Sequence, residues 1–505
     1  MLKEKKITLI FNSGALLLFF ILVIESFLRT GNNSENLMNE YIYFSSDSLL
    51  RNILRVGIIL LVFFVLGILY DRYRKEISIH RIRGIVCLIS LIVSIYWIGA
   101  SNTAPWADQQ NICDYAVAFN QGDFTGLQKG GYVASCPQQL GLITLMRIFF
   151  WFFGNGNFRP FQYFSALMVP VIILAGSMIV RKLSQENELA ELFYLFLIIL
   201  CLPLYGYVPF VYGEICSTAF ILLATWMFLS CLDFFNWRKV IMLGGMIGIA
   251  VQMRQNALIM VIAFLIVIVV KLISGKRERY VWATGISVIF GVLLFQFIIK
   301  GIYFDVMPKD SKAMPAVLYV TMGTNYENDN AGWYNSYNFS TFEKNNYEVK
   351  LSQEEAKKDL WLFIEKCMNN PRYVADFYYN KIMSQWNAPM YQCLAMNNNI
   401  IGPQSKLAGS IYSGSLRSKI EAFMNIYQLL IYSGVLWMLF MVRKEWCKIE
   451  KYVFLICIVG GFLFSIIWEA KTRYVFPYFI MMIPYAAIGI QILVNKMFKY
   501  KGKNK

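Results

Sequence analysis

An aspartate at the end of an apolar segment is the first residue of this chain whose position suggests chemistry. Asp108 lies in the sequence Thr-Ala-Pro-Trp-Ala-Asp-Gln-Gln, which begins at Thr103. The residues after it have the spacing of an amphipathic helix that ends at a glycine: Ile112, Tyr115, Ala116, Phe119 and Gly122. A carboxylate at the predicted N-cap of that helix can stabilise it by about 1 kcal/mol. It can equally act as a general base that accepts a proton from a substrate.

Charged residues also interrupt two later apolar stretches. Arg254 lies between two of them, and Glu469, Lys471 and Arg473 lie between the last two. Both groups have a simple structural explanation. Arg254 can be a loop arginine whose side chain extends into water, and the later group can be a solvated turn with a Glu–Arg pair. In the topology described below, all of them fall on the same side as the aspartate. Such a set could bind an anionic lipid head group and deprotonate a hydroxyl group beside it.

The composition predicts an α-helical membrane protein. The 505 residues are 57% hydrophobic and 15% charged, with a mean hydropathy of +0.49. Soluble domains contain about 25% charged residues. Repeated apolar runs of about 17–25 residues predict a mainly α fold with about 12 membrane spans. The first run follows Lys3, Lys5 and Lys6 and resembles a signal peptide, but no small-residue cleavage site follows it, so we interpret it as a retained helix.

The positive charge is distributed as membrane topology requires. The formal charge is +16, and basic residues cluster in short segments between apolar runs. The clusters are Arg72, Arg74, Lys75, Arg81 and Arg83; Lys276, Arg277 and Arg279; Arg443, Lys444, Lys448 and Lys451; and the tail from Lys496 to Lys505. Basic loops of this kind face the cytoplasm, so the charge does not indicate nucleic-acid binding. We therefore predict a protein of the cell membrane with both of its termini in the cytoplasm.

Predicted spans lie near residues 7–28, 52–70, 84–100, 160–180, 190–207, 213–232, 240–253, 256–272, 281–299, 422–442, 452–468 and 475–495. The apolar run 138–154 is interpreted as an interfacial helix instead. These spans divide the chain into four predicted parts. They are a hairpin over 1–83, a transmembrane core over 84–299 with a catalytic outer loop at 101–159, an outer domain over 300–421, and terminal helices over 422–505. In the outer domain, Ser352 and Glu355 form a predicted capping box for a helix through Cys367, and Pro371 starts the next helix.

Several kinds of chemistry are excluded or left open by residue types. His80 is the single histidine, which excludes histidine-ligated metals and Ser-His-Asp catalysis. Glycine-rich phosphate loops are absent, which excludes an ATPase. Four of the ten cysteines lie in the predicted outer segments, at Cys113, Cys136, Cys367 and Cys393. They could form two disulfides, but free thiols are the favoured interpretation.

The outer segments resemble those of GT-C glycosyltransferases, in particular the protein O-mannosyltransferases and the lipid A aminoarabinose transferase. The first outer loop carries the resemblance in Asp108, the helix around Tyr115, then Tyr132 and Pro137 ahead of an apolar helix. Arg254-Gln-Asn is similar to a central motif of that group. The sequence from Glu469 to Pro477 resembles their last outer turn. Gly323 through Trp333, and then Lys381 and Trp386, resemble the long last loop of bacterial members.

This resemblance implies a polyprenyl-phosphate-linked sugar donor and transfer at the outer face to a glycan, lipid or protein acceptor. Asp108 matches the catalytic aspartate of the group. Cations would bind the donor phosphate, at Arg254, Arg473, Lys471 and Lys381, and other residues would contact substrate, at Tyr115, Tyr132, Gln109 and Glu469. No residue is assigned to a metal. Gln109 stands where several relatives have a second acid, and Ser135-Cys136-Pro137 replaces their lysine before a double proline, so a divalent cation and the acceptor's identity stay open.

Two other classes of protein share part of this pattern. A flippase or transporter for lipid-linked sugars is expected to place charges near the middle of the membrane, whereas these charges lie at its edge. An O-antigen-type polymerase or ligase would also work at the outer face with functional arginines. Such an enzyme does not need an aspartate at the start of the first outer loop.

Overall fold

A computed structural model describes residues 2–33, 42–276, 278–327, 330–442 and 446–503, so the predicted basic residues Arg277, Arg443 and Lys444 and the last two residues lie outside it. Ten of the described helices are long and apolar enough to cross a membrane. They are α1 (Leu2–Leu28), α2 (Leu49–Tyr73), α3 (Ile79–Ser101), α7 (Arg159–Leu183), α10 (Glu214–Asp233), α12 (Leu258–Ile273) together with the 3-10 turn Gln255–Ala257 before it, α13 (Arg279–Ile302), α19 (Arg417–Val442), α20 (Val453–Ile467) together with the 3-10 turn Ile449–Tyr452 before it, and α21 (Phe476–Lys503). The prediction of a helical, multi-pass membrane protein is confirmed.

Two of the predicted spans are shorter helices in the structure. The segment 190–207 contains α8 (Glu188–Ile199) and α9 (Leu202–Gly206), which are separated by a break, and the segment 240–253 is α11 (Trp237–Met253). With 12 residues, α8 rises only about 18 Å, which is less than the apolar core of a bilayer. The α8–α9 pair nevertheless joins the two ends of the molecule. Glu191 of α8 pairs with Arg83 at one end, and Val211 after α9 donates a hydrogen bond to Gln109 at the other.

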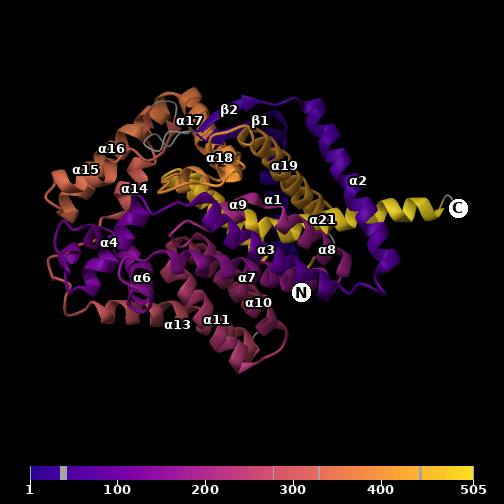
Figure 1. Ribbon diagram of the computed structural model, residues 1–505, viewed down its shortest axis with the longest axis horizontal. Coiled ribbons are helices and arrows are strands. Elements are labelled where there is room, and N and C mark those ends of the chain that lie inside the picture. The colour runs from indigo at the N-terminus through magenta and orange to yellow at the C-terminus, as the bar shows by residue number, and fades with distance from the viewer. Residues whose placement is uncertain (1, 34–41, 277, 328–329, 443–445, 504–505) are drawn as a thin grey trace.

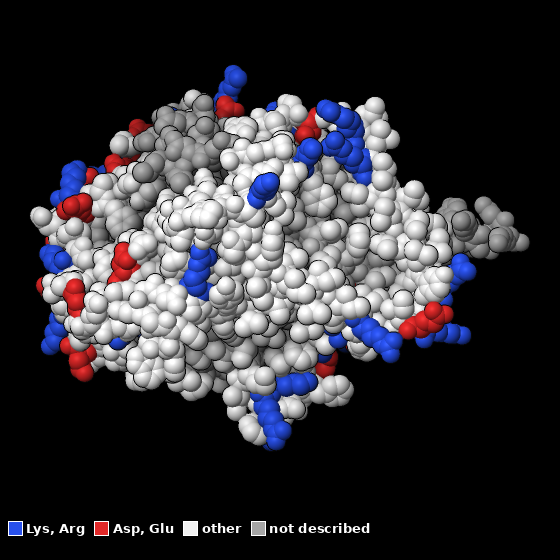
Figure 2. Space-filling model, viewed as in Figure 1, with Lys and Arg blue, Asp and Glu red and all other residues white. Residues whose placement is uncertain are grey.

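Ion pairs bring the basic turns together at one end of the helices. Glu4 contacts both Lys276 (3.2 Å) and the backbone N–H of Ile449 (3.0 Å), and Lys271 pairs with Glu450 at 3.0 Å. The N-terminus, the α12–α13 turn and the α19–α20 connection therefore meet at the same end. Charged side chains gather toward the edges of the face shown in Figure 2, and the area between them has few.

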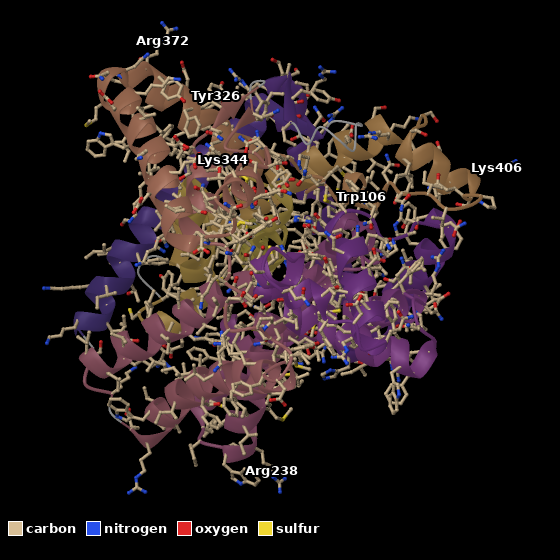
Figure 3. All side chains as sticks on the ribbon, turned by 90° about the vertical axis from the view of Figure 1, so that its left-hand side faces the viewer. Trp106, Arg238, Tyr326, Lys344, Arg372 and Lys406 are labelled. Carbon is tan, nitrogen blue, oxygen red and sulfur yellow. The ribbon has the colours of Figure 1, made fainter. Side chains whose placement is uncertain are left out.

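The opposite end carries two groups of shorter helices. The predicted first outer loop forms α4 (Asp108–Asn120), α5 (Tyr132–Ser135) and α6 (Leu140–Phe153), and the long segment forms α14 (Ala316–Met322), α15 (Tyr337–Lys344), α16 (Val349–Asn369), α17 (Pro371–Trp386) and α18 (Lys406–Tyr412). Figure 1 shows α14 to α16 beside α4 and α6. In Figure 3, Arg372 and Lys344 of the long segment lie at the far end from Arg238, in the first turn of α11. The predicted helix 138–154 is α6, which at 14 residues is too short to span.

Local signals predicted some helix starts correctly and one wrongly. Pro371 begins α17, and the side chain of Asn370 caps it by accepting a hydrogen bond from the backbone of Tyr373 at 3.1 Å. The capping box at Ser352 is wrong, because α16 already begins at Val349 and the Ser352 hydroxyl donates to the Glu348 carbonyl at 2.8 Å. All ten cysteines, each of which lies in the described residues, are free thiols.

Two short antiparallel hairpins complete the fold. Strand β1 (Arg29–Asn33) pairs with β2 (Ile42–Ser46), and β3 (Tyr326–Glu327) pairs with β4 (Asn330–Ala331). The β1–β2 hairpin contacts the end of α17, where Gly31 N–H donates to the Asn387 carbonyl at 2.8 Å. A side chain at Gly31 would meet that carbonyl at 2.8 Å, so only glycine fits. The hairpin thereby supports the segment after α17, which contacts the candidate site.

We expect the end that carries α4 and α16 to face the outside, because the basic turns gather at the other end. Single cysteines that replace the exposed Gln128 and Lys350 should react with an impermeant thiol reagent in intact cells. The parent should first lack Cys113, Cys136, Cys367 and Cys393. Arg238→Cys, at an exposed position at the start of α11 at the opposite end, should react only after permeabilisation. If only Arg238→Cys is labelled in intact cells, the orientation in the membrane is the reverse of the one expected.

Candidate active site

Asp108 is the first residue of α4, but it does not cap that helix. The N-cap position is Ala107, whose backbone has φ 48° and ψ −126°, and no side chain caps the helix. The predicted N-cap role of Asp108 is therefore wrong. A non-glycine residue with this backbone is strained, and such strain is concentrated at functional sites. The carboxylate of Asp108 instead accepts hydrogen bonds from Tyr132 Oη at 3.3 Å and Arg473 Nη2 at 3.4 Å, while 42% of its side chain stays exposed.

Arg473 is buried in the turn between α20 and α21 and retains an unused hydrogen-bond donor. Its guanidinium lies over the rings of Tyr212 and Tyr474, at 5.4 and 5.5 Å, and its Nη1 contacts the sulfur of Met396 at 3.8 Å. Its Nε, although buried, has no hydrogen-bond partner in the described structure. Leaving a buried donor unpaired typically costs about 1–3 kcal/mol. An acceptor on a bound ligand would remove that cost.

Arg254 lies beside Arg473 and is held by a buried carboxylate. It follows α11, and its Nη2 lies 3.2 Å from Glu214 Oε1. The Arg254 guanidinium lies 4.7 Å from the centre of the Tyr212 ring, which therefore contacts both arginines. The interpretation of Arg254 as a loop arginine that reaches for water is wrong. Neither Glu214 nor Tyr212 was predicted from the sequence. Glu214 could have been recognised, because it is a charged residue directly ahead of an apolar span.

The turn from Glu469 to Arg473 is buried rather than solvated. The exposed fractions of Glu469 and Lys471 are 5% and 7%, and the two side chains pair at 3.4 Å. Glu469 also accepts a hydrogen bond from Tyr474 Oη at 3.2 Å. The proposed Glu–Arg surface pair is therefore wrong, because Glu469 contacts the lysine and tyrosine and Arg473 contacts Asp108. The Lys471 ammonium lies 5.0 Å from the centre of the Tyr334 ring.

Of the remaining residues predicted to contact substrate, only one lies against Asp108. Tyr132 contacts the carboxylate directly, whereas Tyr115 stacks behind Tyr132 with ring centres 5.7 Å apart. Gln109 is buried, and its amide group donates to the Met396 carbonyl at 3.1 Å and accepts from the Val211 backbone at 2.8 Å. Gln109 thus connects three segments of the site, and both ends of its amide already have partners.

Lys381 lies behind the cluster rather than in it. This residue of α17 is 1% exposed, and its ammonium donates to the Gly323 carbonyl at 2.5 Å. Burial lowers the pKa of Lys381 to about 7, although the carboxylate of Glu469 opposes the shift. A side chain at Gly332, where φ is 74°, would collide with the Lys381 stem. Lys381 therefore connects the 323–333 loop to α17 instead of facing Asp108.

Lys381 should make stability rise with pH. Its pKa is about 7 in the folded state and has the usual value of 10.5 when unfolded, so only the unfolded chain binds this proton between those values. Stability should therefore increase from pH 7 to pH 10, with a slope of up to about 1.4 kcal/mol per pH unit. Lys381→Met should flatten the increase in thermal midpoint measured between pH 7 and 10. Lys357→Met, at an exposed position in α16, serves as the control and should retain the parent's slope.

Three cations keep Asp108 ionised. Burial favours the neutral acid, but the charge of Arg473, followed by those of Lys471 and Arg254, outweighs it and lowers the pKa of Asp108 below its usual value of 3.8. The carboxylate is therefore charged at neutral pH and can accept a proton. No group of three or more His, Cys, Asp or Glu side chains suited to a metal occurs among the residues that the structure describes.

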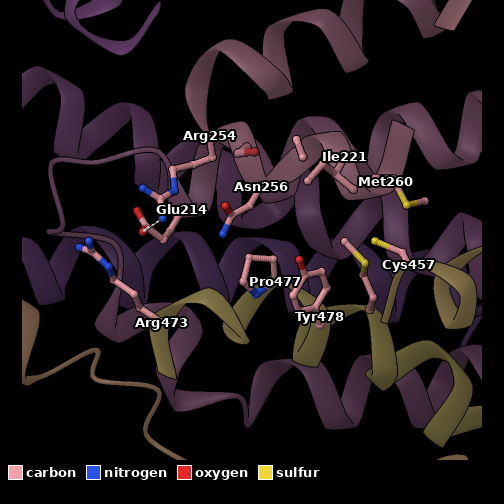
Figure 4. Close-up of a pocket in the computed structure, with 12 residues that line it drawn as sticks. Glu214, Ile221, Arg254, Asn256, Met260, Cys457, Arg473, Pro477 and Tyr478 are labelled. Carbon is pink, nitrogen blue, oxygen red and sulfur yellow. Dashed lines mark ion pairs between the residues drawn. The ribbon is translucent and has the colours of Figure 1, made fainter. Parts of the chain in front are cut away.

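A cavity with an empty volume of about 390 Å³ begins at the two arginines and continues between the helices. Figure 4 shows Glu214, Arg254 and Arg473 at one end of this cavity, with Met260 and Cys457 at the other. Further apolar lining comes from α10 and α21. The cavity thus offers positive charge at one end and an apolar wall deeper between the helices.

Comparisons with known proteins found similarity only at the level of solved structures. No protein-family model and no curated protein match the chain. It aligns with the archaeal oligosaccharyltransferase AglB from Archaeoglobus fulgidus, in complex with an inhibitory peptide and a dolichol-phosphate (13% identity, TM-score 0.42, 85% of this chain and 52% of that one). A structure of the A. fulgidus oligosaccharyltransferase tethered to an acceptor peptide aligns at 12% identity and TM-score 0.45, covering 85% and 51%.

ArnT from Cupriavidus metallidurans, bound to undecaprenyl phosphate, aligns at 11% identity and TM-score 0.33, covering 80% of this chain and 77% of that one. The chain spans about half of the length of the two oligosaccharyltransferase chains. These proteins are membrane glycosyltransferases of the GT-C superfamily, the group that the sequence motifs resemble. The TM-scores of these three structures are below 0.5, so the function has to follow from the residues of the site itself.

Proposed function

We propose that this protein is a membrane glycosyltransferase that moves a sugar from a polyprenyl-phosphate carrier to a hydroxyl-bearing acceptor of the cell envelope, at the outer face of the membrane. The observation that carries the proposal is the position of a half-exposed carboxylate beside buried arginines at the charged end of a partly apolar cavity. Asp108 lies 3.4 Å from Arg473, and Arg473 and Arg254 both line the cavity.

The cavity has the two chemical properties that a lipid phosphate requires. A phosphate needs cationic donors, and arginine binds its oxygens in a forked geometry that lysine cannot provide. The unpaired Nε of Arg473 is such a donor. An isoprenoid chain needs an apolar surface, which Ile221, Met260 and Cys457 supply deeper in the cavity. Lys471 contributes positive charge, because it helps to lower the pKa of Asp108.

In the proposed reaction, the acceptor hydroxyl attacks the anomeric carbon of the donor sugar. The new carbon–oxygen bond forms as the bond to the phosphate oxygen breaks, and the bonding electrons leave with the lipid phosphate. Arg473 and Arg254 stabilise the charge on that phosphate. The acceptor's proton passes to the carboxylate of Asp108. Tyr132, which donates to the same carboxylate, positions it for this transfer.

The low pKa of Asp108 determines when the proton moves. A carboxylate with a lowered pKa is a weak base, so it cannot deprotonate a hydroxyl group before bonding begins. Glycosyl transfer passes through an oxocarbenium-like state, and the acceptor oxygen becomes acidic once it bonds to that carbon. The proton therefore moves late. Binding of a phosphate to Arg473 would also draw its charge away from Asp108 and raise the pKa of the base.

Turnover in a defined membrane tests this function. Purified protein in nanodiscs should release undecaprenyl phosphate from at least one undecaprenyl-phosphate monosaccharide when membrane extracts supply the acceptor, and the sugar should appear in a product of the extract. Gln255→Ala, at an exposed position next to the site, serves as the control and should retain this activity. A parent protein that binds no undecaprenyl phosphate and consumes no lipid-linked sugar would refute the proposal.

A further inference from the structure

Two tyrosine rings contact both arginines of the site. The centre of the Tyr212 ring lies 4.7 Å from the guanidinium carbon of Arg254 and 5.4 Å from that of Arg473. The centre of the Tyr474 ring lies 5.7 and 5.5 Å from the same two carbons. All four distances are within the range of about 6 Å over which a cation is attracted to an aromatic face. The two rings, which we call the tyrosine pair, therefore act on both cations at once.

The hydroxyl group of each tyrosine is fixed by a polar partner other than the arginines. Gln139, directly before α6, donates from its Nε2 to Tyr212 Oη, and Tyr474 Oη donates to Glu469 at 3.2 Å. Tyr212 is also only 2% exposed, so other groups enclose its ring. A ring that is fixed at its hydroxyl end and enclosed by its neighbours has little freedom to turn. The tyrosine pair therefore provides fixed surfaces against which the longer arginine side chains can be ordered.

The backbone on either side of the first ring is fixed as well. A side chain at Gly213 would collide with the backbone carbonyl directly before Arg254, so glycine lets this loop touch the turn after α11. On the other side, the Val211 N–H donates to the Gln109 side chain at 2.8 Å, and Gln109 directly follows Asp108. The loop that carries the ring is therefore joined both to the segment of the base and to the turn of Arg254.

Contact with a ring restrains a guanidinium without occupying its N–H groups. Arginine has five N–H donors, and each hydrogen bond to a protein acceptor makes one of them unavailable to a ligand. In the described structure, the buried Nε of Arg473 has no hydrogen-bond partner, and Arg254 pairs with Glu214 through Nη2. Attraction to a ring face requires no acceptor atom, because it arises from the negative charge of the π face. The tyrosine pair can thus order both side chains and leave donors for a phosphate.

The rings also offset the repulsion between two positive charges. The side chains of Arg254 and Arg473 are 15% and 6% exposed, and Figure 4 shows their guanidinium groups at the same end of the cavity. Salt screens the repulsion between partly buried charges only weakly. Glu214 and Asp108 each pair with one arginine, whereas each ring of the tyrosine pair contacts both. In the described structure, the rings are therefore the contacts that fix the spacing between the two arginines.

We infer that Tyr212 and Tyr474 are positioning residues, whose rings hold Arg254 and Arg473 at a spacing that a single phosphate group can bridge. The inference rests on the proposed function, because it takes a lipid phosphate as the ligand of both arginines. Neither tyrosine has to contact the phosphate itself. Tyr212 should contribute more than Tyr474, since its ring lies closer to both guanidinium carbons.

The affinity for undecaprenyl phosphate, measured with the purified protein in nanodiscs, tests this role. Tyr212→Leu removes the ring and should weaken binding by about 10–100-fold, because two cation–π contacts are lost. Tyr474→Leu should weaken binding by about 3–10-fold, since its contacts with the arginines are longer. Tyr212→Phe keeps the ring and loses the hydrogen bond from Gln139, so it should bind within about threefold of the parent.

A positioning role also predicts how the variants combine. If Tyr212 acts through the arginines, Tyr212→Leu should weaken binding less in an Arg473→Gln protein than in the parent, because one of its two targets is gone. A ring with a purely structural role would cause the same loss in both proteins. Tyr303→Leu is the matched control. Tyr303 is fully buried and its ring lies 5.6 Å from the Arg147 guanidinium, but it does not line the cavity, so this variant should bind as the parent does.

Four results would overturn the inference alone. They are folded Tyr212→Leu and Tyr474→Leu variants that bind as tightly as the parent, a Tyr212→Phe variant as weak as Tyr212→Leu, equal losses from Tyr212→Leu in the parent and in the Arg473→Gln protein, and a Tyr303→Leu variant as weak as Tyr212→Leu. If Tyr212→Leu does not fold, Tyr474→Leu, at a half-buried position, decides the result. A parent that binds no undecaprenyl phosphate would overturn the proposed function together with the inference.

Discussion

Asp108→Asn should yield a folded protein that binds the donor normally and transfers sugar about 10²–10⁴-fold more slowly than the parent. Asparagine keeps one oxygen, which can accept the hydrogen bond from Arg473, and its NH2 group can donate to the Tyr132 hydroxyl, so the local structure should persist. It cannot accept the acceptor's proton. Because Asp108 caps no helix, the thermal midpoint should change little. The measurements are donor affinity, thermal midpoint and the rate at which undecaprenyl phosphate is released.

Asp108→Glu separates the charge of the base from its position. The carboxylate is kept, but the longer side chain displaces it by about 1 Å, and such a displacement can cost roughly 10²-fold in rate. Tyr132→Phe removes the hydroxyl that contacts the carboxylate and should slow transfer less than Asp108→Asn does. If Asp108→Asn transfers sugar at a rate near that of the parent, Asp108 is not the base.

Arg473→Gln should weaken donor binding by about 10–100-fold, because hydrogen bonds to charged groups are worth about 1.5–3 kcal/mol. It should also change the pH profile. In the parent, the pKa of Asp108 lies below 3.8, so kcat/KM should not fall as the pH decreases from 7 to 5. Without the charge of Arg473, burial raises the pKa of Asp108, and the acidic decrease in kcat/KM should move upward toward neutral pH.

Two controls distinguish charge from geometry in this cluster. Arg473→Lys keeps the charge and should keep the parent's pH profile, but it loses the forked contact and should bind donor less tightly. Arg254 needs a paired variant, because Arg254→Gln alone leaves the buried Glu214 without its cation. Arg254→Gln combined with Glu214→Gln should fold and weaken donor binding. An Arg473→Gln variant with the parent's affinity and pH profile would reduce Arg473 to a structural residue.

The sequence identified the main charged residues of the site because membrane topology restricts where they can lie. Asp108, Arg254 and Arg473 each end an apolar segment on the same predicted side, and the structure joins Asp108 to Arg473 and places both arginines on one cavity. Charge is rare in a membrane protein, so its order along the chain carries information. The same reasoning also predicted ten of the long helices.

Contacts that depend on helix packing could not be predicted in this way. Gln385 is an ordinary polar residue of α17, and its unpaired oxygen becomes evident only where α17 meets α20. Lys381 resembled a phosphate ligand, yet packing against Gly332 directs it to the Gly323 carbonyl. The N-cap prediction for Asp108 failed because the strained backbone of Ala107 turns the carboxylate toward Arg473. No local pattern specifies such a turn.

The most direct test of the central claim is a structure of the protein in nanodiscs with undecaprenyl phosphate. The phosphate should lie between Arg254 and Arg473 and accept a hydrogen bond from the Arg473 Nε, which has no partner in the described structure. The isoprenoid chain should pass Met260 and Cys457, and the Asp108 carboxylate should remain exposed beside the phosphate. A lipid phosphate bound elsewhere, with the Arg254–Glu214 and Arg473–Asp108 pairs unchanged, would contradict the assignment of this site.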